Sequence, residues 1–584
     1  MRCDGTESNR KVAVVVDAGW SGLLSMRWLL REGIDVIAIE ESDRIGGVWN
    51  HVPPGTTASS SKTYLHSSSL DFESDSDFPT ADEVLKHLRR YAAKHELERH
   101  IRFNTRLESY RFDGRLREWT LRVAKHGERE GDEVLRSNFL VFARGLCGAP
   151  TVPEDLRTQL DAIGVPSVHS FNCRSPSAGG GDERRLDWLS ADEAEREAGS
   201  AGRVLVVGGG ESATDVASEL ADRGVRVILS LRTGRWFLPR EKLSSSSAHR
   251  EEGSRPLPAD VASRRTYFLM GFEFFRSLLD RWITGNLNGT GGHGIDAWAP
   301  SRGVSSWSCF LNKRSEDVLD HVRAGRIDAA AAITAITGDG AGSAVVEFAH
   351  APEPKRIRGV VFATGFAPAG ATAQGSQALD APDQSLLHVF PTNSEDAFGT
   401  VAYVGAVRPA LGSIPSVAEF SAAFAASVFS GRSSLPSVER ARAEVRAQTA
   451  LRMRSFPEDG LRYRTLVHTN VYADRVLEHM GCWIPVRGLP PLLDLVRTYG
   501  SVVEGMFAFW TLLMCPWSTL ELEVHFSEPE AGRDALERIR ASNRERKRRD
   551  SSFFVWDLLA SSVGAEIIRG WRRIAVFARA ARLF

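Results

Sequence analysis

Two glycine-containing turns, each between an apolar run and a helical pattern, constrain this 584-residue chain more than any other feature. Residues 11–16 (KVAVVV) and 203–207 (RVLVV) are continuous apolar runs, typical of strands buried on both faces of a parallel sheet. A helical pattern follows each turn, and a further strand is expected after each helix, at 35–40 and 225–231. Two such βαβ units, about 190 residues apart, predict an α/β fold with two doubly wound, Rossmann-type domains.

The second turn has the composition of a dinucleotide-binding loop. Gly208 permits the tight turn, Gly210 lets the backbone approach a pyrophosphate, and Ala213 is small enough for close packing of helix on strand. Glu211 and Ser212 begin the helix, whose N-terminal amides and dipole favour an anion. The sequence therefore predicts a dinucleotide site at this turn.

The strand after that turn indicates which dinucleotide is bound. An NAD site would place an acidic residue at its end, to hold the ribose diol. This chain has Ser230 and Arg232 instead, a hydroxyl and a guanidinium that suit a 2′-phosphate. We therefore expect NADP, the alternative being that Arg232 is an ordinary surface arginine.

The first turn, Asp17 to Gly22, keeps only part of the same pattern. Gly19 and Gly22 stand at the second and third glycine positions, and Asp17 stands at the first. Glu40 ends the next strand, where its carboxylate could accept hydrogen bonds from both ribose hydroxyls. The segment I-G-G-V-W that follows contributes Gly46, Gly47 and Trp49.

From these residues onward the chain resembles the flavin-containing monooxygenase family. A strand-ending glutamate followed by I-G-G-x-W resembles its FAD-binding half, and residues 59–62 (SSSK) are similar to its N-x-S-K segment. Residues 230–236 (SLRTGRW) resemble its NADP strand, and 362–366 (FATGF) resemble its A-T-G linker strand. Residues 405–419 are similar to its late flavin-contacting segment, and the likeness extends from about residue 11 into the 510s.

The resemblance implies an architecture, two cofactors and a reaction. An FAD domain would be made of residues 8–155 and 336–470, with an NADP domain (156–335) inserted and a helical C-terminal region (471–584) after it. NADPH would reduce FAD, O2 would form a C4a-hydroperoxyflavin, and an amine nitrogen or sulfide sulfur would take one oxygen atom. Ser59 would be catalytic, and the residues expected at the cofactors are Asp17, Gly19, Gly22, Glu40, Gly46, Gly47, Trp49, Ser61, Arg144, Gly208, Gly210, Glu211, Ser212, Ala213, Ser230, Arg232, Thr364 and Gly365.

The chain departs from the family pattern near the flavin. Asp17 replaces a glycine, and its carboxylate would repel the pyrophosphate of FAD. Arg144 stands in A-R-G where the family has A-T-G or A-S-G, and we hypothesise that its guanidinium partly neutralises Asp17. Ser59 replaces the asparagine of N-x-S-K, and His169 belongs to a loosely kept F-x-G-x-x-x-H fingerprint, where a structural role is favoured over that of a catalytic base.

Two other functions remain open at this point. Asp17 and Arg144 could mark a degenerate relative that keeps the fold but binds flavin weakly and acts as a non-catalytic nucleotide-binding protein. The third possible function is that of a flavin enzyme with other chemistry, either a Baeyer–Villiger oxygenase or an NADPH oxidase. The colour of the purified protein separates the first two, because bound flavin is yellow.

Composition excludes some partners and suggests a compartment. A formal net charge of −1 gives no electrostatic case for nucleic acid, and six scattered cysteines without a C-x-x-C pair indicate a reducing, cytoplasmic location without a metal site. We expect no signal peptide, and the apolar run at 505–514 is too short to span a bilayer. The aromatic and arginine-rich tail (567–584) favours docking on the protein itself, with peripheral membrane contact as the alternative. The substrate pocket is expected from the 264–298 region and the C-terminal helices.

Overall fold

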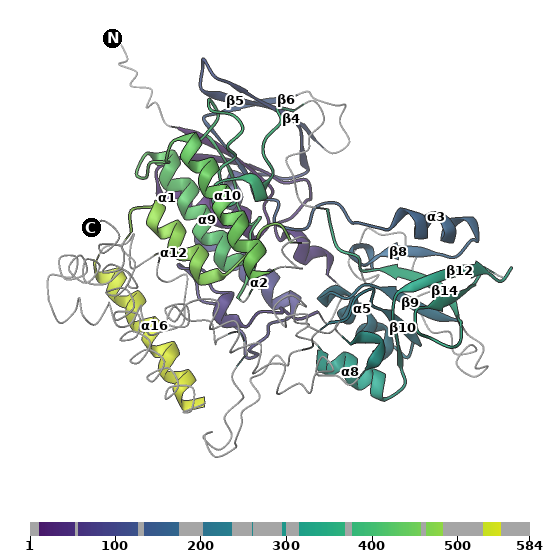
Figure 1. Cartoon of the computed structure of the whole chain (residues 1–584). Helices are drawn as coiled ribbons and strands as arrows, with labels where there is room; N and C mark the ends of the chain where they lie inside the picture. Colours follow the sequence, from purple (N-terminus) through teal and green to yellow (C-terminus); the bar gives the residue numbers. More distant parts are fainter. Residues whose placement is uncertain are drawn as a thin grey trace, which may run out of the picture.

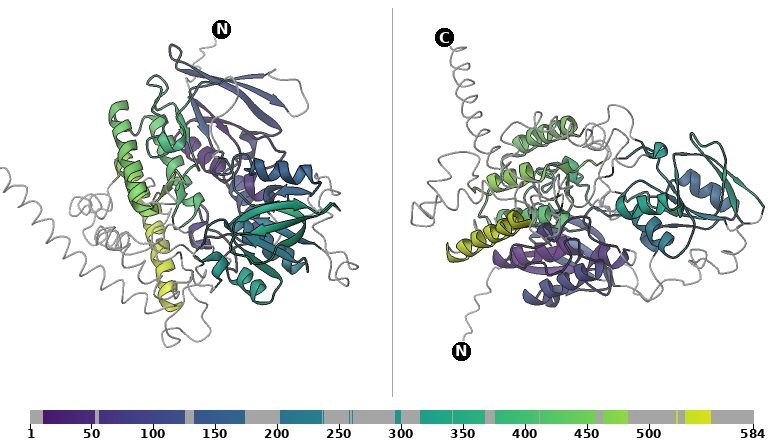
Figure 2. Two further views of the ribbon diagram at one scale, coloured as in Figure 1. Left: turned by 45° about the vertical axis from the view of Figure 1, so that its right-hand side comes forward. Right: turned by 90° about the horizontal axis from the view of Figure 1, so that it is seen from below.

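The protein folds into two lobes (Figure 1). The computed structural model describes residues 11–52, 56–125, 133–173, 202–235, 237, 258, 260, 295–299, 315–340, 342–367, 376–410, 412–456, 463–482, 522 and 529–549. The first lobe contains the N-terminal βαβ unit and the late helices, and the second lies between them in the sequence (Figures 1 and 2). The predicted α/β class, with one dinucleotide-binding fold inserted into another, is confirmed.

The first lobe is built on a five-stranded parallel sheet in the order β15-β7-β1-β2-β3. Two of these strands, β1 and β2, fall where the sequence predicts strands. β3 and β15 are short edge strands at either side of the sheet. Their bounds are β1 (Val12–Val16), β2 (Asp35–Ile39), β3 (Ile101–Arg102), β7 (Phe139–Phe142) and β15 (Val401–Tyr403).

Both faces of this sheet are covered, which explains the unbroken apolar runs. Ala13 and Val15 of β1 pack with helices α1 (Trp20–Arg31) and α9 (Ile414–Ser430), whereas Val14 and Val16 point to the opposite core. That second core lies under an antiparallel three-stranded sheet, visible at the top of Figure 1. It consists of β4 (Thr105–Asp113), β5 (Glu118–Lys125) and β6 (Glu133–Ser137).

The second lobe carries a seven-stranded sheet in the order β11-β10-β9-β14-β13-β12, with β8 also pairing β14. Helices α5 and α8 cover one face, and α3 packs with the other. The elements are α3 (Glu154–Ala162), β8 (Ser167–His169), β9 (Arg203–Val207), α5 (Glu211–Asp222), β10 (Val227–Ser230), η10 (Asp296–Trp298), α8 (Ser315–Arg323), β11 (Ile327–Ala330), β12 (Ile333–Gly338), β13 (Ala344–Phe348) and β14 (Lys355–Phe362).

This sheet corrects one predicted domain boundary. The sequence placed the return to the FAD domain at residue 336, but β12, β13 and β14 all belong to the second lobe. The antiparallel hairpin β12–β13 leads into β14, which pairs in parallel with β9 and completes the core of the nucleotide sheet. The chain therefore leaves the second lobe only after β14, at the A-T-G segment.

Late helices form a layer over the first lobe, green in Figure 1. α9 packs against α1, and α12 packs against α9, so these two late helices contribute to the core of this lobe. The further helix α16 ends at Arg549, and the 567–584 tail lies outside the described residues. The remaining elements of the described chain, in which η marks a 3-10 helix, are η1 (Gly47–His51), η2 (Lys62–Tyr64), α2 (Ala81–Lys94), η3 (Glu98–His100), η4 (Ser170–Asn172), η11 (Pro382–Gln384), β16 (Arg408–Pro409), α10 (Val438–Ser455), β17 (Leu466–Val467), α12 (Thr469–His479) and α16 (Pro529–Arg549).

Among the helices of the described residues, none is both long and apolar enough to cross a bilayer. Trp298, at the end of the region expected to line the substrate pocket, is instead core. It is fully buried, stacks on Phe237 and donates from Nε1 to the Ala330 carbonyl at 3.2 Å.

His87 on α2 is a buried histidine that makes the first lobe sensitive to acid. Its ring stacks on that of Phe72, with 4.6 Å between the ring centroids. Neither ring nitrogen of this buried histidine has a hydrogen-bond partner among the described residues. Burial, with a smaller effect of Arg90, lowers its pKa to about 4. An unfolded histidine titrates near pH 6.5, so the unfolded state binds more protons and stability falls as the pH drops from about 6.5 to about 4.

We expect His87→Phe to remove this part of the acid sensitivity. Between pH 7.5 and pH 5 the wild type should lose roughly 2 kcal/mol more unfolding free energy than the variant, from about 1.4 kcal/mol per pH unit below 6.5. Urea unfolding at the two pH values measures the difference. Equal losses in both proteins would contradict this role of His87.

Candidate active site

The first glycine-containing turn keeps a glycine-like backbone despite its aspartate. Asp17 has φ 80°, in the left-handed region that residues other than glycine rarely adopt. Its amide donates to the Ile39 carbonyl at 2.8 Å. Gly22 is required here, because a Cβ at that position would lie 2.0 Å from the Asp17 carbonyl oxygen. Gly19 caps α1 and packs against Gly47, whose added Cβ would lie 3.1 Å from the Gly19 Cα. The structure thus brings the I-G-G-V-W segment onto the turn.

Glu40 lies immediately after β2 and is buried. Its Oε2 accepts from the Ala18 amide at 2.7 Å, and its Oε1 accepts from the amide and hydroxyl of Ser42 at 2.9 and 2.6 Å. The carboxylate is therefore fixed beside the turn by three donors. A carboxylate has about four acceptor positions, so this arrangement leaves capacity for a ribose hydroxyl.

Asp17 and Arg144 lie together, as hypothesised. The Arg144 Nε is 3.6 Å from the Asp17 Oδ2, and the two side chains keep 28% and 34% of their surface exposed. Loss of water around the carboxyl is the main effect that raises the pKa of Asp17, to about 6. The nearby Arg144 guanidinium lowers this pKa, and the Glu40 and Glu41 carboxylates raise it. The carboxyl therefore titrates close to neutral pH instead of being fully ionised well below it.

The S-S-S-K segment places its three serines differently. Ser61 is fully buried, and its hydroxyl has no hydrogen-bond partner among the described residues. Ser60 donates to the Gly412 carbonyl at 2.7 Å, joining the segment to the turn before α9. Ser59, the predicted catalytic position, is only half-buried. Trp49 is partly buried against the core of the first lobe.

Gly208, in the second turn, is fixed by its contact with the A-T-G segment. It has φ 146°, and a Cβ there would lie 2.3 Å from the Ala363 carbonyl oxygen. α5 begins at Glu211 directly after Gly210, and Ala213 is fully buried against the sheet. Ser212 lies in the first turn of this helix. The predicted loop-to-helix geometry is therefore present.

The two residues expected to recognise a 2′-phosphate separate in the structure. Ser230 is buried, and its hydroxyl donates to the Ala331 carbonyl at 2.7 Å, whereas Arg232 is exposed. Of these two side chains, only that of Arg232 is exposed and therefore accessible to a ligand. Arg235, which sequence reasoning missed, lies buried beside the turn with its Nε 3.4 Å from the Gly209 carbonyl.

Thr364 and Gly365 lie where the two connections between the lobes run side by side. The Thr364 hydroxyl donates to the Thr151 carbonyl, and the Gly365 carbonyl accepts from the Thr151 amide at 2.9 Å. His169 Nε2 also bonds that carbonyl, at 3.0 Å, while its Nδ1 accepts from the Phe171 amide at 3.2 Å. With both ring nitrogens engaged and burial lowering its pKa, His169 has the structural, linking role favoured from the sequence.

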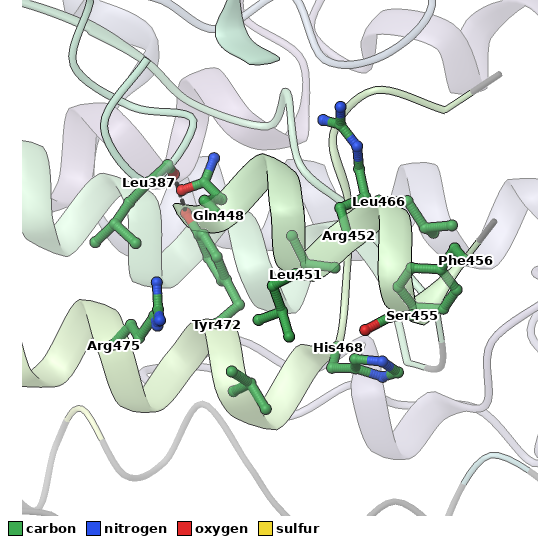
Figure 3. A pocket seen from close by; sticks show the side chains of 12 residues that line it. Leu387, Gln448, Leu451, Arg452, Ser455, Phe456, Leu466, His468, Tyr472 and Arg475 are labelled. Atoms are coloured by element: carbon green, nitrogen blue, oxygen red, sulfur yellow. Dashed lines mark hydrogen bonds between the residues drawn. The ribbon is translucent and has the colours of Figure 1, made fainter. Parts of the chain in front are cut away.

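A small cavity lies between α10 and α12 (Figure 3). Its volume is about 40 Å³, and its walls are mainly apolar, with Leu451 and Phe456 among them. Small-molecule sites generally measure about 300–1,000 Å³. This cavity is therefore a gap in the packing of the helical layer and not the substrate pocket.

The chain's own residues fit both cofactors. A carboxylate fixed beside the first turn and the contact of Gly47 with Gly19 form a cradle suited to FAD. The fully buried Ser61 hydroxyl, which has no hydrogen-bond partner among the described residues, is available to a ligand. Gly208 and the N-terminus of α5 form a second cradle, suited to NADP. The fold and these two cradles define a flavoprotein with two dinucleotide sites.

Comparisons with known proteins identify the family. The family model described as flavin-binding monooxygenase-like matches residues 9–482. Flavin-containing monooxygenase 5 of Homo sapiens is 26% identical over 456 residues, covering 75% of this chain and 76% of that protein. Dimethylaniline monooxygenase [N-oxide-forming] 2 of Mus musculus is 25% identical over 491 residues, covering 81% and 83%. The solved structure of OTEMO in complex with FAD and NADP aligns with a TM-score of 0.55 at 15% identity, covering 80% of this chain and 97% of that one.

The chain belongs to the flavin-binding monooxygenase-like family. It is therefore a flavin-dependent monooxygenase, and its two cradles suit FAD and NADP.

Proposed function

We propose that the protein transfers one oxygen atom from O2 to a soft nucleophile, an amine nitrogen or a sulfide sulfur. The fully buried Ser61 hydroxyl, which has no hydrogen-bond partner among the described residues, carries this proposal, because it lies in the segment expected to contact the flavin. The N-oxide-forming relative supports a nucleophilic heteroatom as the target. When bound, FAD accepts hydride from NADPH and activates O2, chemistry that the protein side chains do not need to supply.

In this proposal the protein binds the two cofactors, orients them and excludes water from the site. Glu40 holds the FAD ribose, and the amides at the start of α1 face the pyrophosphate. The start of α5 and Arg232 hold NADP. The Ser61 hydroxyl is available to bond the flavin from within the buried S-S-S-K segment, and Ser59 lies at its more exposed end.

Flavin content and coupled turnover test the proposal. We expect the purified protein, after incubation with FAD and gel filtration, to absorb near 450 nm as bound flavins do. NADPH consumption should then rise with a tertiary amine or a thioether, and mass spectrometry should find a product heavier by one oxygen. A protein that retains no flavin after saturation with FAD overturns the proposal. Conversion of cyclic ketones to lactones, without oxidation of amines or sulfides, overturns the heteroatom assignment.

Arg232→Ala is expected to raise the Kd for NADP⁺ roughly tenfold and to leave that for NAD⁺ nearly unchanged. An exposed guanidinium bonded to a phosphate contributes about 1.5 kcal/mol, and NAD⁺ lacks that phosphate. Titration with both nucleotides, followed by protein fluorescence, measures the two constants. Equal weakening for both would assign Arg232 a role outside 2′-phosphate recognition.

A further inference from the structure

Asp260 carries a carboxylate buried against the S-S-S-K segment. The side chain is 1% exposed, and its Oδ2 accepts from the Ser61 backbone amide at 2.7 Å. Ser61 is itself fully buried. A hydrogen bond between an ionised acceptor and a buried amide is among the stronger kinds in proteins, and removing the acceptor leaves the amide unsatisfied.

In the sequence, the carboxylate lies between two elements of the second lobe. Residue 260 lies between β10 and η10, both elements of the nucleotide lobe. Just beyond β10 and at the end of η10, the Arg235 amide donates to the Trp298 carbonyl at 3.0 Å, so the chain on either side is fixed to that lobe. The Asp260–Ser61 bond therefore joins a residue of the sequence between β10 and η10 to the segment of the first lobe that contains Ser61, whose hydroxyl has no partner among the described residues.

The geometry of Ser61 shows what this bond controls. Hydrogen bonds fix the segment on either side, because the Ser60 hydroxyl donates to the Gly412 carbonyl at 2.7 Å and the Lys62 amide donates to the Asp77 carbonyl at 2.7 Å. The Ser61 amide donates to Asp260, whereas the Ser61 hydroxyl has no hydrogen-bond partner among the described residues. The backbone amide at the residue that carries this hydroxyl is therefore held by the Asp260 carboxylate.

We propose that Asp260 is a positioning residue for the flavin, which acts by holding the Ser61 backbone so that its hydroxyl faces the cofactor. The inference rests on the proposed function, since it requires FAD to lie at the S-S-S-K segment. It adds a residue from the nucleotide lobe to the determinants of the flavin site.

Two substitutions of the full-length protein test the inference. Asp260→Ala should raise the Kd for FAD at least tenfold, whereas Asp260→Asn, whose amide oxygen still accepts from Ser61, should stay within about threefold of the wild type. Asp260→Glu retains the charge but displaces the acceptor, and it should shift the visible circular dichroism of the bound flavin. FAD titration by flavin fluorescence and the visible spectra of the saturated proteins provide both readouts.

Asp380→Ala is the matched control. Asp380 also accepts a backbone amide, that of Thr392 at 3.1 Å, in the loop before β15. It should leave the Kd for FAD and the flavin spectrum unchanged. Failure of the wild type to bind FAD overturns the proposed function itself. A wild type that binds FAD, together with wild-type affinity in Asp260→Ala and an unchanged spectrum in Asp260→Glu, overturns the positioning role alone.

Discussion

Asp17→Gly is expected to tighten FAD binding roughly thirtyfold at pH 8. Two like charges about 5 Å apart, at an effective dielectric constant near 20, repel by about 3 kcal/mol. Arg144, with its Nε 3.6 Å from the carboxylate, offsets part of this repulsion and leaves about 2 kcal/mol. Titration of the flavin-free proteins with FAD gives the two dissociation constants.

The same substitution separates charge from backbone strain. Asp17 holds φ at 80°, which costs a residue with a side chain about 1 kcal/mol or more relative to glycine. That strain is present with and without FAD, so its relief should appear as a higher unfolding free energy of the flavin-free protein and not as affinity. Asp17→Asn removes the charge but keeps a side chain at this φ. It should gain affinity, and at pH 8 it should gain only the stability that comes from removing the buried charge, not the part that comes from relieving the backbone strain. Wild-type affinity in this variant would show that the charge is not what weakens binding.

Features set by local sequence and strand order were predictable. β1 and β2 follow from their apolar runs, and the burial of alternate residues on two cores explains why those runs are continuous. The Asp17–Arg144 pair also followed from the sequence. β1 and β7 are parallel neighbours with Val16 beside Phe142, so residues shortly after each must meet at the same edge of the sheet.

Features that depend on side-chain direction or on the path of the chain were not predictable. Ser230 and Arg232 share one segment, but the hydroxyl points into the core and bonds Ala331, which no spacing rule revealed. The boundary expected at residue 336 was wrong because an antiparallel hairpin extends the nucleotide sheet. Asp260 contacts Ser61 across 199 positions of sequence, and nothing in the composition around either residue indicates that contact.

FAD affinity of the wild type is expected to depend on pH through Asp17. The pKa of this carboxyl is raised to about 6, mainly by burial and then by Glu40 and Glu41, with Arg144 opposing. The folded protein therefore binds this proton more tightly than the unfolded chain, whose aspartate titrates near 3.9. Stability at this site is accordingly lost as the pH rises from about 4 to about 6, and above that range the carboxylate faces the cofactor ionised.

The Kd for FAD should therefore rise by tenfold or more between pH 5.5 and pH 8 (on the order of the charge repulsion above), because the phosphates of FAD stay ionised throughout while Asp17 gains its charge. Burial lowers the pKa values of His87 and His388 to about 4, and their protonation favours unfolding in acid. The titration stops at pH 5.5 so that this acid unfolding does not determine the measured Kd. Asp17→Asn has no titrating group at this position and should show a nearly flat profile. A parallel rise in both proteins would assign the pH dependence to another group, whereas a rise confined to the wild type identifies Asp17 as the residue that sets flavin affinity near neutral pH.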